Sequence, residues 1–131
     1  MNARSQFHIV SLLVIFTTGG VAQRSPEAPH KFWDRKNQAL FVIHAGVEGT
    51  DFAITHDNLA NGGHETNPLG RSLCESGTPG QVTFFAARTL GALGISYLFH
   101  VTNHHRLERV TTMFMISDSA YGMAYSFAHR R

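Results

Sequence analysis

The side chains best suited to chemistry lie within one apolar stretch of the chain, residues 40–58. Imidazole and carboxylate groups one helical turn apart can bind a transition metal ion together, as inward-facing residues do in metal-binding helical bundles. The residues with this chemistry are His44, Glu48, Asp51 and His56. They form a candidate metal site, although the chain lacks the repeated Glu-x-x-His motif of dinuclear carboxylate bundles.

An ion-pair network is the main alternative for the same stretch. Positions 44, 48, 51 and 55 lie on one face of a helix because they follow the spacing i, i+4, i+7, i+11. Isolated charges in two later apolar stretches could meet this face inside a bundle. The predicted polar seam consists of His44, Glu48, Asp51, Arg88 and Asp118. Arg88 would neutralise the acids, and in a membrane such a seam could also relay protons or ions.

A turn motif follows the first apolar stretch. It consists of Gly62, Gly63, Glu65, Asn67 and Pro68. Glycine accepts the left-handed backbone that ends helices, and Asn followed by Pro is typical of a helix start. We expect Asn67 to cap a short helix and Glu65 to accept backbone hydrogen bonds. This is a structural role rather than a ligand-binding one.

These groups must be positioned by helices. The start and stop signals predict long helices at about residues 34–61, 79–101 and 106–129, and a short helix at about 68–75. Thr78, Pro79 and Gln81 predict a capping box at the second long helix. No stretch alternates like a β-strand. The predicted fold class is all-α, a small helical bundle.

The N-terminal region precedes this domain. Residues 1–22 are typical of a signal peptide, because Arg4 precedes an uncharged stretch that ends in small residues near Ala22. An uncleaved membrane anchor is the alternative, since the 19 uncharged residues 5–23 approach the roughly 20 that span a bilayer. Residues 23–33, with two prolines, are the predicted linker, and residues 34–131 the helical domain.

The composition excludes several classes of protein. Only 15% of the residues are charged, against roughly 25% in average soluble domains. Cys74 is the only cysteine, so no internal disulfide can form. The basic residues are not clustered, which argues against nucleic-acid binding. Nothing resembles a nucleophile elbow or a Gly-rich phosphate loop, so we predict no enzyme and no cofactor other than the candidate metal ion.

Three histidines gather between the second and third long helices. His100 and His104 are one turn apart, and His105 follows directly. We expect them at an interface or in solvent, where protonated imidazole favours the negative end of a helix. Metal or haem ligation is the alternative, but no Cys-x-x-Cys-His motif accompanies them.

Each long helix could cross a bilayer by length, but Glu48, Asp51 and Asp57 oppose insertion of the first. Polar faces turned inward would give a membrane bundle, and polar faces turned outward an exported soluble one. The distribution of Lys and Arg conflicts with cleavage and export, because cytoplasmic loops normally carry the positive excess. The sequence leaves the topology open.

A short pattern adds to this picture. Asp51 and Thr55, followed by Gly-Gly-His-Glu-Thr-Asn-Pro-Leu at residues 62–69, resemble a family of small uncharacterised bacterial membrane proteins. Members have an intramembrane Asp and a Gly-Gly-x-Glu-x-Asn-Pro turn, and the resemblance covers about residues 35–105. It implies a polytopic helical protein of the bacterial inner membrane, in contact with lipid, and implies no activity.

The expected function is therefore that of a non-enzymatic helical membrane protein with a polar seam. The alternatives are an exported soluble helical protein, periplasmic or secreted, and a membrane protein with a metal- or proton-handling His/Glu/Asp site. A protein partner or a homo-oligomer is not predicted by any feature of the sequence.

Overall fold

The structure is a computed structural model that describes residues 28–128. These residues form the helices α2 (Arg35–Ala60), α3 (Arg71–Cys74), α4 (Thr78–Val101) and α5 (His105–Ala128), and no strand occurs among them. The prediction of an all-α bundle with three long helices is confirmed. The predicted signal peptide or anchor, residues 1–22, lies outside the described residues.

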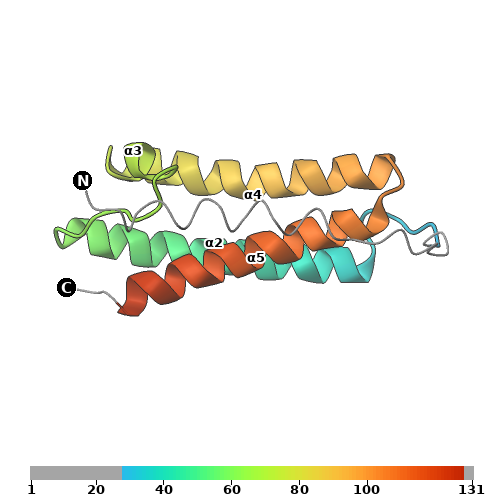
Figure 1. The fold of residues 1–131 in the computed structure, drawn as a ribbon, viewed down its shortest axis with the longest axis horizontal. Coiled ribbons are helices and arrows are strands. Elements are labelled where there is room, and N and C mark those ends of the chain that lie inside the picture. The colour runs from blue at the N-terminus through green and yellow to red at the C-terminus, as the bar shows by residue number, and fades with distance from the viewer. Residues whose placement is uncertain (1–27, 129–131) are drawn as a thin grey trace, which may run out of the picture.

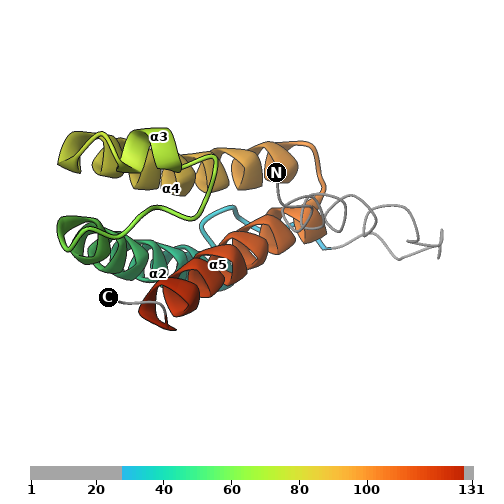
Figure 2. The ribbon, with the colours of Figure 1, turned by 60° about the vertical axis from the view of Figure 1, so that its left-hand side comes forward.

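The three long helices lie side by side, with α2 and α5 running in the same direction and α4 in the opposite one (Figure 1). One end of the bundle therefore joins the starts of α2 and α5 to the end of α4. We call it the histidine end. The short helix α3 packs on α4 at the opposite end, as the turned view shows (Figure 2).

The boundaries of α2 follow from its caps. The Asp34 side chain accepts a hydrogen bond from the backbone N–H of Asn37 at 2.8 Å and caps the start. At the other end Gly62 has a φ of 80°, and the Gly63 N–H donates to the Asn58 carbonyl at 2.8 Å. This is the glycine-dependent helix ending that the sequence predicts.

One element is shorter than predicted, and one local prediction is wrong. The short helix forms but spans only Arg71–Cys74; residues 68–70 before it are a turn, in which the Asn67 side chain accepts from the Leu69 N–H at 3.0 Å. The capping box at residues 78–81 does not form, because Gly77 is the N-cap and no side chain caps α4. The amide of Gln81 bonds instead to His56 and to the carbonyl of Cys74.

The interior of the bundle is polar. In the described part of the chain, eleven polar residues are buried, against the apolar residues Phe32, Cys74, Phe85 and Ala92. The buried polar residues are Asn37, His44, Glu48, Asp51, Thr55, Gln81, Ser96, His105, Glu108, Thr112 and Ser119. A soluble bundle has the reverse arrangement, because burying apolar surface drives its folding.

Large apolar side chains lie on the outer faces. Within residues 28–128, eighteen large hydrophobic residues are exposed, among them Val42, Leu90 and Phe114. Of the described helices, α4 is long and apolar enough to cross a membrane by length and composition. Only 17% of its most apolar stretch is buried in the bundle, whereas the core helix of a soluble protein is mostly buried.

Candidate functional site

Two polar clusters occupy the interior. The first, which we call the Arg88 cluster, lies midway along the bundle and contains His44, Glu48, Asp51, Arg88, Asp118 and Ser119. The second, which we call the histidine cluster, lies at the histidine end and contains His30, His100, His105 and Glu108.

In the Arg88 cluster one guanidinium from α4 faces carboxylates of both neighbouring helices. Arg88 Nη2 lies 2.7 Å from Asp118 Oδ2, and Arg88 Nε lies 3.2 Å from Glu48 Oε1. The contact to Asp51 is longer, at 4.0 Å. The structure thus brings together the charged residues of the predicted seam.

Ser119 and His44 also lie against Oε1 of Glu48, whereas Glu48 Oε2 and His44 Nε2 are buried without a hydrogen-bond partner. The Ser119 hydroxyl donates to Glu48 Oε1 at 2.6 Å and accepts from Arg88 Nη2 at 2.8 Å. His44 Nε2 lies 3.3 Å from the same carboxylate oxygen. Because three helices contribute hydrogen-bonding groups, this cluster specifies how α2, α4 and α5 align along their length.

The four residues of the predicted metal site are not gathered. His44 and Glu48 are neighbours, and Asp51 faces Arg88, but His56 Nδ1 bonds to Gln81 Oε1 at 2.8 Å. The reason is helical periodicity: at about 100° per residue, His56 lies roughly 120–140° around α2 from His44 and Asp51. It therefore faces the start of α4 instead of the seam.

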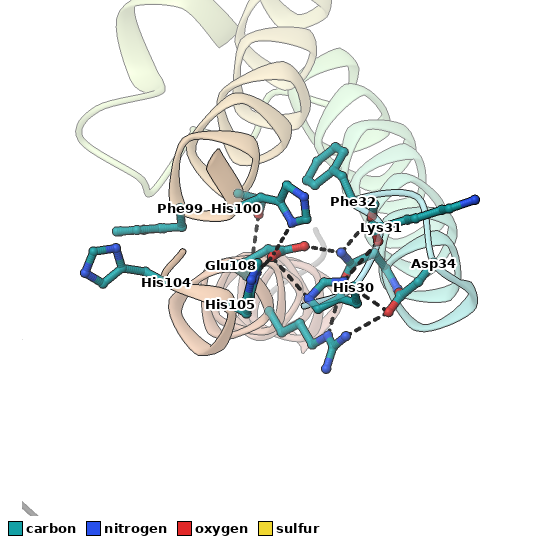
Figure 3. Close-up of polar contacts among 12 residues, drawn as sticks. His30, Lys31, Phe32, Asp34, Phe99, His100, His104, His105 and Glu108 are labelled. Atoms are coloured by element: carbon teal, nitrogen blue, oxygen red, sulfur yellow. Dashed lines mark hydrogen bonds and ion pairs between the residues drawn. The ribbon is translucent and has the colours of Figure 1, made fainter. Parts of the chain in front are cut away.

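The histidine cluster is built around one oxygen of a buried carboxylate. Glu108 Oε2 lies 3.0 Å from His100 Nδ1, 3.1 Å from His105 Nδ1 and 3.5 Å from His30 Nε2 (Figure 3). Glu108 is 1% exposed and His105 is buried. The three imidazoles come from the segment before α2, the end of α4 and the start of α5.

A second layer holds this arrangement. Asn37 Nδ2 donates to the other oxygen of Glu108 and to the Phe32 carbonyl, the latter at 2.8 Å. Arg109 donates to Asn37 Oδ1 at 3.3 Å and to Asp34 Oδ2 at 2.8 Å. The backbone N–H of Asn37 and the Arg109 charge hold the pKa of Asp34 below its ordinary value, against a smaller opposing effect of burial.

Most of this cluster was not predicted from the sequence. His30 falls in the predicted linker, yet Phe32 beside it is buried against the rings of Phe41, Tyr97 and His100. Of the three histidines near the turn, His104 points away from the cluster and lies against Phe99 (Figure 3). The spacing His105-x-x-Glu108, which puts both side chains on one helix face, was the available signal.

The turn motif is held by local hydrogen bonds, although the N-cap of α3 is Gly70 rather than Asn67. Glu65 Oε1 accepts the backbone N–H of Asn67 at 2.7 Å, and Arg71 Nε donates to the Glu65 carbonyl at 2.9 Å. A Cβ at position 63 would lie 2.7 Å from the Asn58 carbonyl oxygen, so only glycine fits there. The motif turns the chain from α2 into α3.

Cys74 is fully buried where α3 meets α4. Burial raises the pKa of its thiol to about 11. The thiol is therefore protonated at neutral pH and fills space as a small apolar group.

The chain was also compared with known proteins. No protein-family model, no curated protein and no solved structure matches it.

Proposed function

We propose that this chain is a small, non-enzymatic membrane protein of the bacterial inner membrane, whose helices α2, α4 and α5 cross the bilayer around a polar interior. The main observation in support is that the distribution of polar and apolar side chains is the reverse of that in a soluble bundle. Polar groups are buried between the helices, and large apolar side chains cover the outside. In water these large apolar side chains would be left in contact with solvent, whereas in lipid the same arrangement is favourable.

The lengths of the helices support the proposal. At about 1.5 Å per residue, 24–26 residues give roughly 36–39 Å, enough for a hydrocarbon core of about 30 Å. Only α4 is sufficiently apolar on average. The averages of α2 and α5 are lowered in part by residues such as Glu48, Asp51 and Ser119, which face the interior and would not meet lipid. Two exposed carboxylates also lower them: Asp57, in the last turn of α2, and Asp118, which pairs with Arg88.

Hydroxyl groups on the outer faces support it as well. Five Ser and Thr hydroxyls each donate to the backbone carbonyl four residues earlier in the chain, at 2.8–2.9 Å. They belong to Thr50, Thr83, Thr102, Thr111 and Ser117. In lipid, where no water is available, this local bond satisfies a hydroxyl that would otherwise be costly.

The ends of the bundle carry interfacial residues. Trp33 and Tyr97 are exposed near the histidine end, and Tyr121 and Tyr125 near the opposite end. Trp and Tyr concentrate where lipid meets water. The two aromatic groups therefore mark the expected edges of the bilayer.

The charges favour one orientation. The described basic residues near the histidine end are Lys31, Arg35, Lys36, Arg106 and Arg109, whereas the loop at the opposite end contains Arg71. The positive-inside rule then places the histidine end in the cytoplasm. This orientation favours the uncleaved anchor over the cleaved signal peptide for residues 1–22.

Fractionation with a topology reporter tests the proposal. The protein is expressed with alkaline phosphatase or green fluorescent protein fused after Arg131, and membranes are washed with alkaline carbonate. We expect the protein to stay in the membrane and the phosphatase fusion to be active, because α5 leads away from the cytoplasmic end. Release by carbonate would overturn the membrane proposal.

A second fusion is the control for orientation. A reporter placed in the turn after Asn103 should give the opposite pattern, with fluorescence and no phosphatase activity. Retention in the membrane with both patterns reversed would keep the bundle and overturn its orientation.

A further inference from the structure

The histidine cluster has the composition and shape of a metal centre. We propose that His30, His100, His105 and Glu108 bind one divalent first-row transition metal ion, for which Zn²⁺ is the best fit. The four ligand atoms, one from each side chain, lie within 4.8 Å of one another. Among the described residues this is the one group of three or more His, Cys, Asp or Glu side chains with such convergence.

The distances match a tetrahedral site. Four ligands at about 2.0–2.1 Å from a zinc ion lie about 3.3–3.4 Å from one another. The three imidazole nitrogens lie 3.0, 3.1 and 3.5 Å from Glu108 Oε2. The three distances to the carboxylate oxygen are thus close to those of a tetrahedral zinc site, and the four ligand atoms all lie within 4.8 Å of one another.

The hydrogen bonds of His30 point to a cation. Its Nδ1 lies 3.0 Å from the Lys31 carbonyl oxygen and 3.3 Å from Asp34 Oδ2. Both are acceptors, so Nδ1 is the atom that donates to them, which leaves Nε2 for Glu108. This Nε2 is buried without a hydrogen-bond partner and faces Glu108 Oε2 at 3.5 Å. An unpartnered ring nitrogen that faces a buried carboxylate oxygen leaves a place for a cation.

The surroundings have the second layer of a metal site. Metal-binding histidines usually donate their other N–H to a carboxylate or carbonyl, as His30 does. Asn37 occupies Glu108 Oε1, which leaves Oε2 to the imidazoles. Asn37 is itself held by the Phe32 carbonyl and Arg109. The donor set is thus fixed in orientation before an ion arrives.

The donor types select the class of ion. Three imidazole nitrogens and one carboxylate suit Zn²⁺ and its first-row neighbours, whereas Ca²⁺ and Mg²⁺ prefer oxygen ligands throughout. The site differs from the set predicted on α2, because its ligands come from three separate segments. A bound ion would tie the segment before α2 to the turn between α4 and α5.

Zinc titration of the purified full-length protein tests the proposal. The protein is prepared in detergent without a polyhistidine tag, stripped with EDTA, and titrated with Zn²⁺ against a chromophoric zinc indicator. We expect one Zn²⁺ per chain. Titration with Co²⁺ should produce the intense visible absorption of tetrahedral coordination. No stoichiometric binding by the wild-type protein would overturn the proposal and leave protonated imidazoles as the partners of Glu108.

Matched double variants locate the site. His100→Ala/His105→Ala should abolish stoichiometric binding, whereas His64→Ala/His104→Ala, which removes two exposed imidazoles outside the cluster, should bind like the wild type. Equal binding by the two variants would overturn the assignment. Circular dichroism and gel filtration establish that each variant is folded.

Single replacements test the site if His100→Ala/His105→Ala does not fold. Glu108→Gln preserves the size of the side chain and should weaken Zn²⁺ binding more than Asp34→Asn does. Asp34→Asn acts through His30 and should weaken it about 10–100-fold. Unchanged zinc affinity in Glu108→Gln would contradict the site.

Discussion

The Arg88 cluster and the histidine cluster each bury a glutamate between α2 and α5, but they compensate its charge in different ways. Glu48, which is 2% exposed, lies beside a guanidinium that is charged at every accessible pH. Glu108, which is 1% exposed, is surrounded by three imidazoles and the amide of Asn37, and Asn37 in turn accepts from Arg109. A permanent cation compensates the buried carboxylate of the first cluster, whereas the second cluster leaves a place for an ion.

The largest expected effect is at Arg88. Arg88→Leu leaves Glu48 and Asp51 buried without their cation, so we expect a loss of about 3–5 kcal/mol in the free energy of unfolding. The control is Arg71→Leu, whose side chain is 56% exposed and pairs loosely with Glu75; it should cost about 0–1 kcal/mol. Denaturant unfolding in micelles, followed by circular dichroism, measures both. Equal losses in the free energy of unfolding would mean that the Arg88 cluster does not stabilise the bundle.

The next effect separates the two clusters by their response to zinc. Free Zn²⁺ at 100 times its Kd should stabilise the wild-type protein by about 2.7 kcal/mol. It should leave His100→Ala/His105→Ala unchanged. Thermal unfolding with and without Zn²⁺ provides the measurement. Stabilisation of the double variant to the same extent would place the bound zinc elsewhere.

A smaller effect is expected at the amide that orients Glu108. Asn37→Ala removes a donor from both Glu108 and the Phe32 carbonyl, so it should cost about 1–3 kcal/mol. Gln38→Ala is the matched control, because its exposed amide donates to the Trp33 carbonyl in the same manner at 2.7 Å. It should cost less than about 0.5 kcal/mol. Equal losses in the free energy of unfolding would mean that burial of the Asn37 amide at the histidine end does not contribute to stability.

The smallest effect is expected at Cys74, which lies far along the bundle from the histidine cluster. Because burial raises its pKa to about 11, the thiolate is scarce at neutral pH and maleimide labelling should be slow, rising as pH approaches 11. The histidine variants should leave this rate unchanged, whereas Arg88→Leu should raise it by loosening the whole bundle. Faster labelling in the histidine variants alone would show that the clusters are coupled.

The course of α2 was predictable because its signals are local. Asp34 as N-cap and the Gly62-Gly63 ending act within one helical turn, so the expected range 34–61 agrees closely with Arg35–Ala60. The stripe at His44, Glu48, Asp51 and Thr55 was likewise predictable, because helical spacing alone puts these positions on one face. Gln81 shows where local signals fail. Its position near the start of α4 predicted a capping role, but its side chain bonds instead to His56 on α2.

Whether the polar face turns inward or outward is not encoded in that spacing. An amphipathic helix has the same sequence pattern in a soluble bundle and in a membrane bundle. Only the packing of α2 against α4 and α5 shows which of its faces is covered. The histidine cluster is a stronger case. His30 is separated from His100, His105 and Glu108 by a long stretch of chain, so no periodicity relates it to the others.

The sequence thus determined the helices, the chemistry of their polar stripes and the turn between α2 and α3, because each depends on interactions between residues a few positions apart. Tertiary structure alone decided that these stripes face one another and that three imidazoles meet one carboxylate. The physical reason is that the helix axes set these distances, and the axes are positioned by packing over the whole bundle rather than by any local pattern.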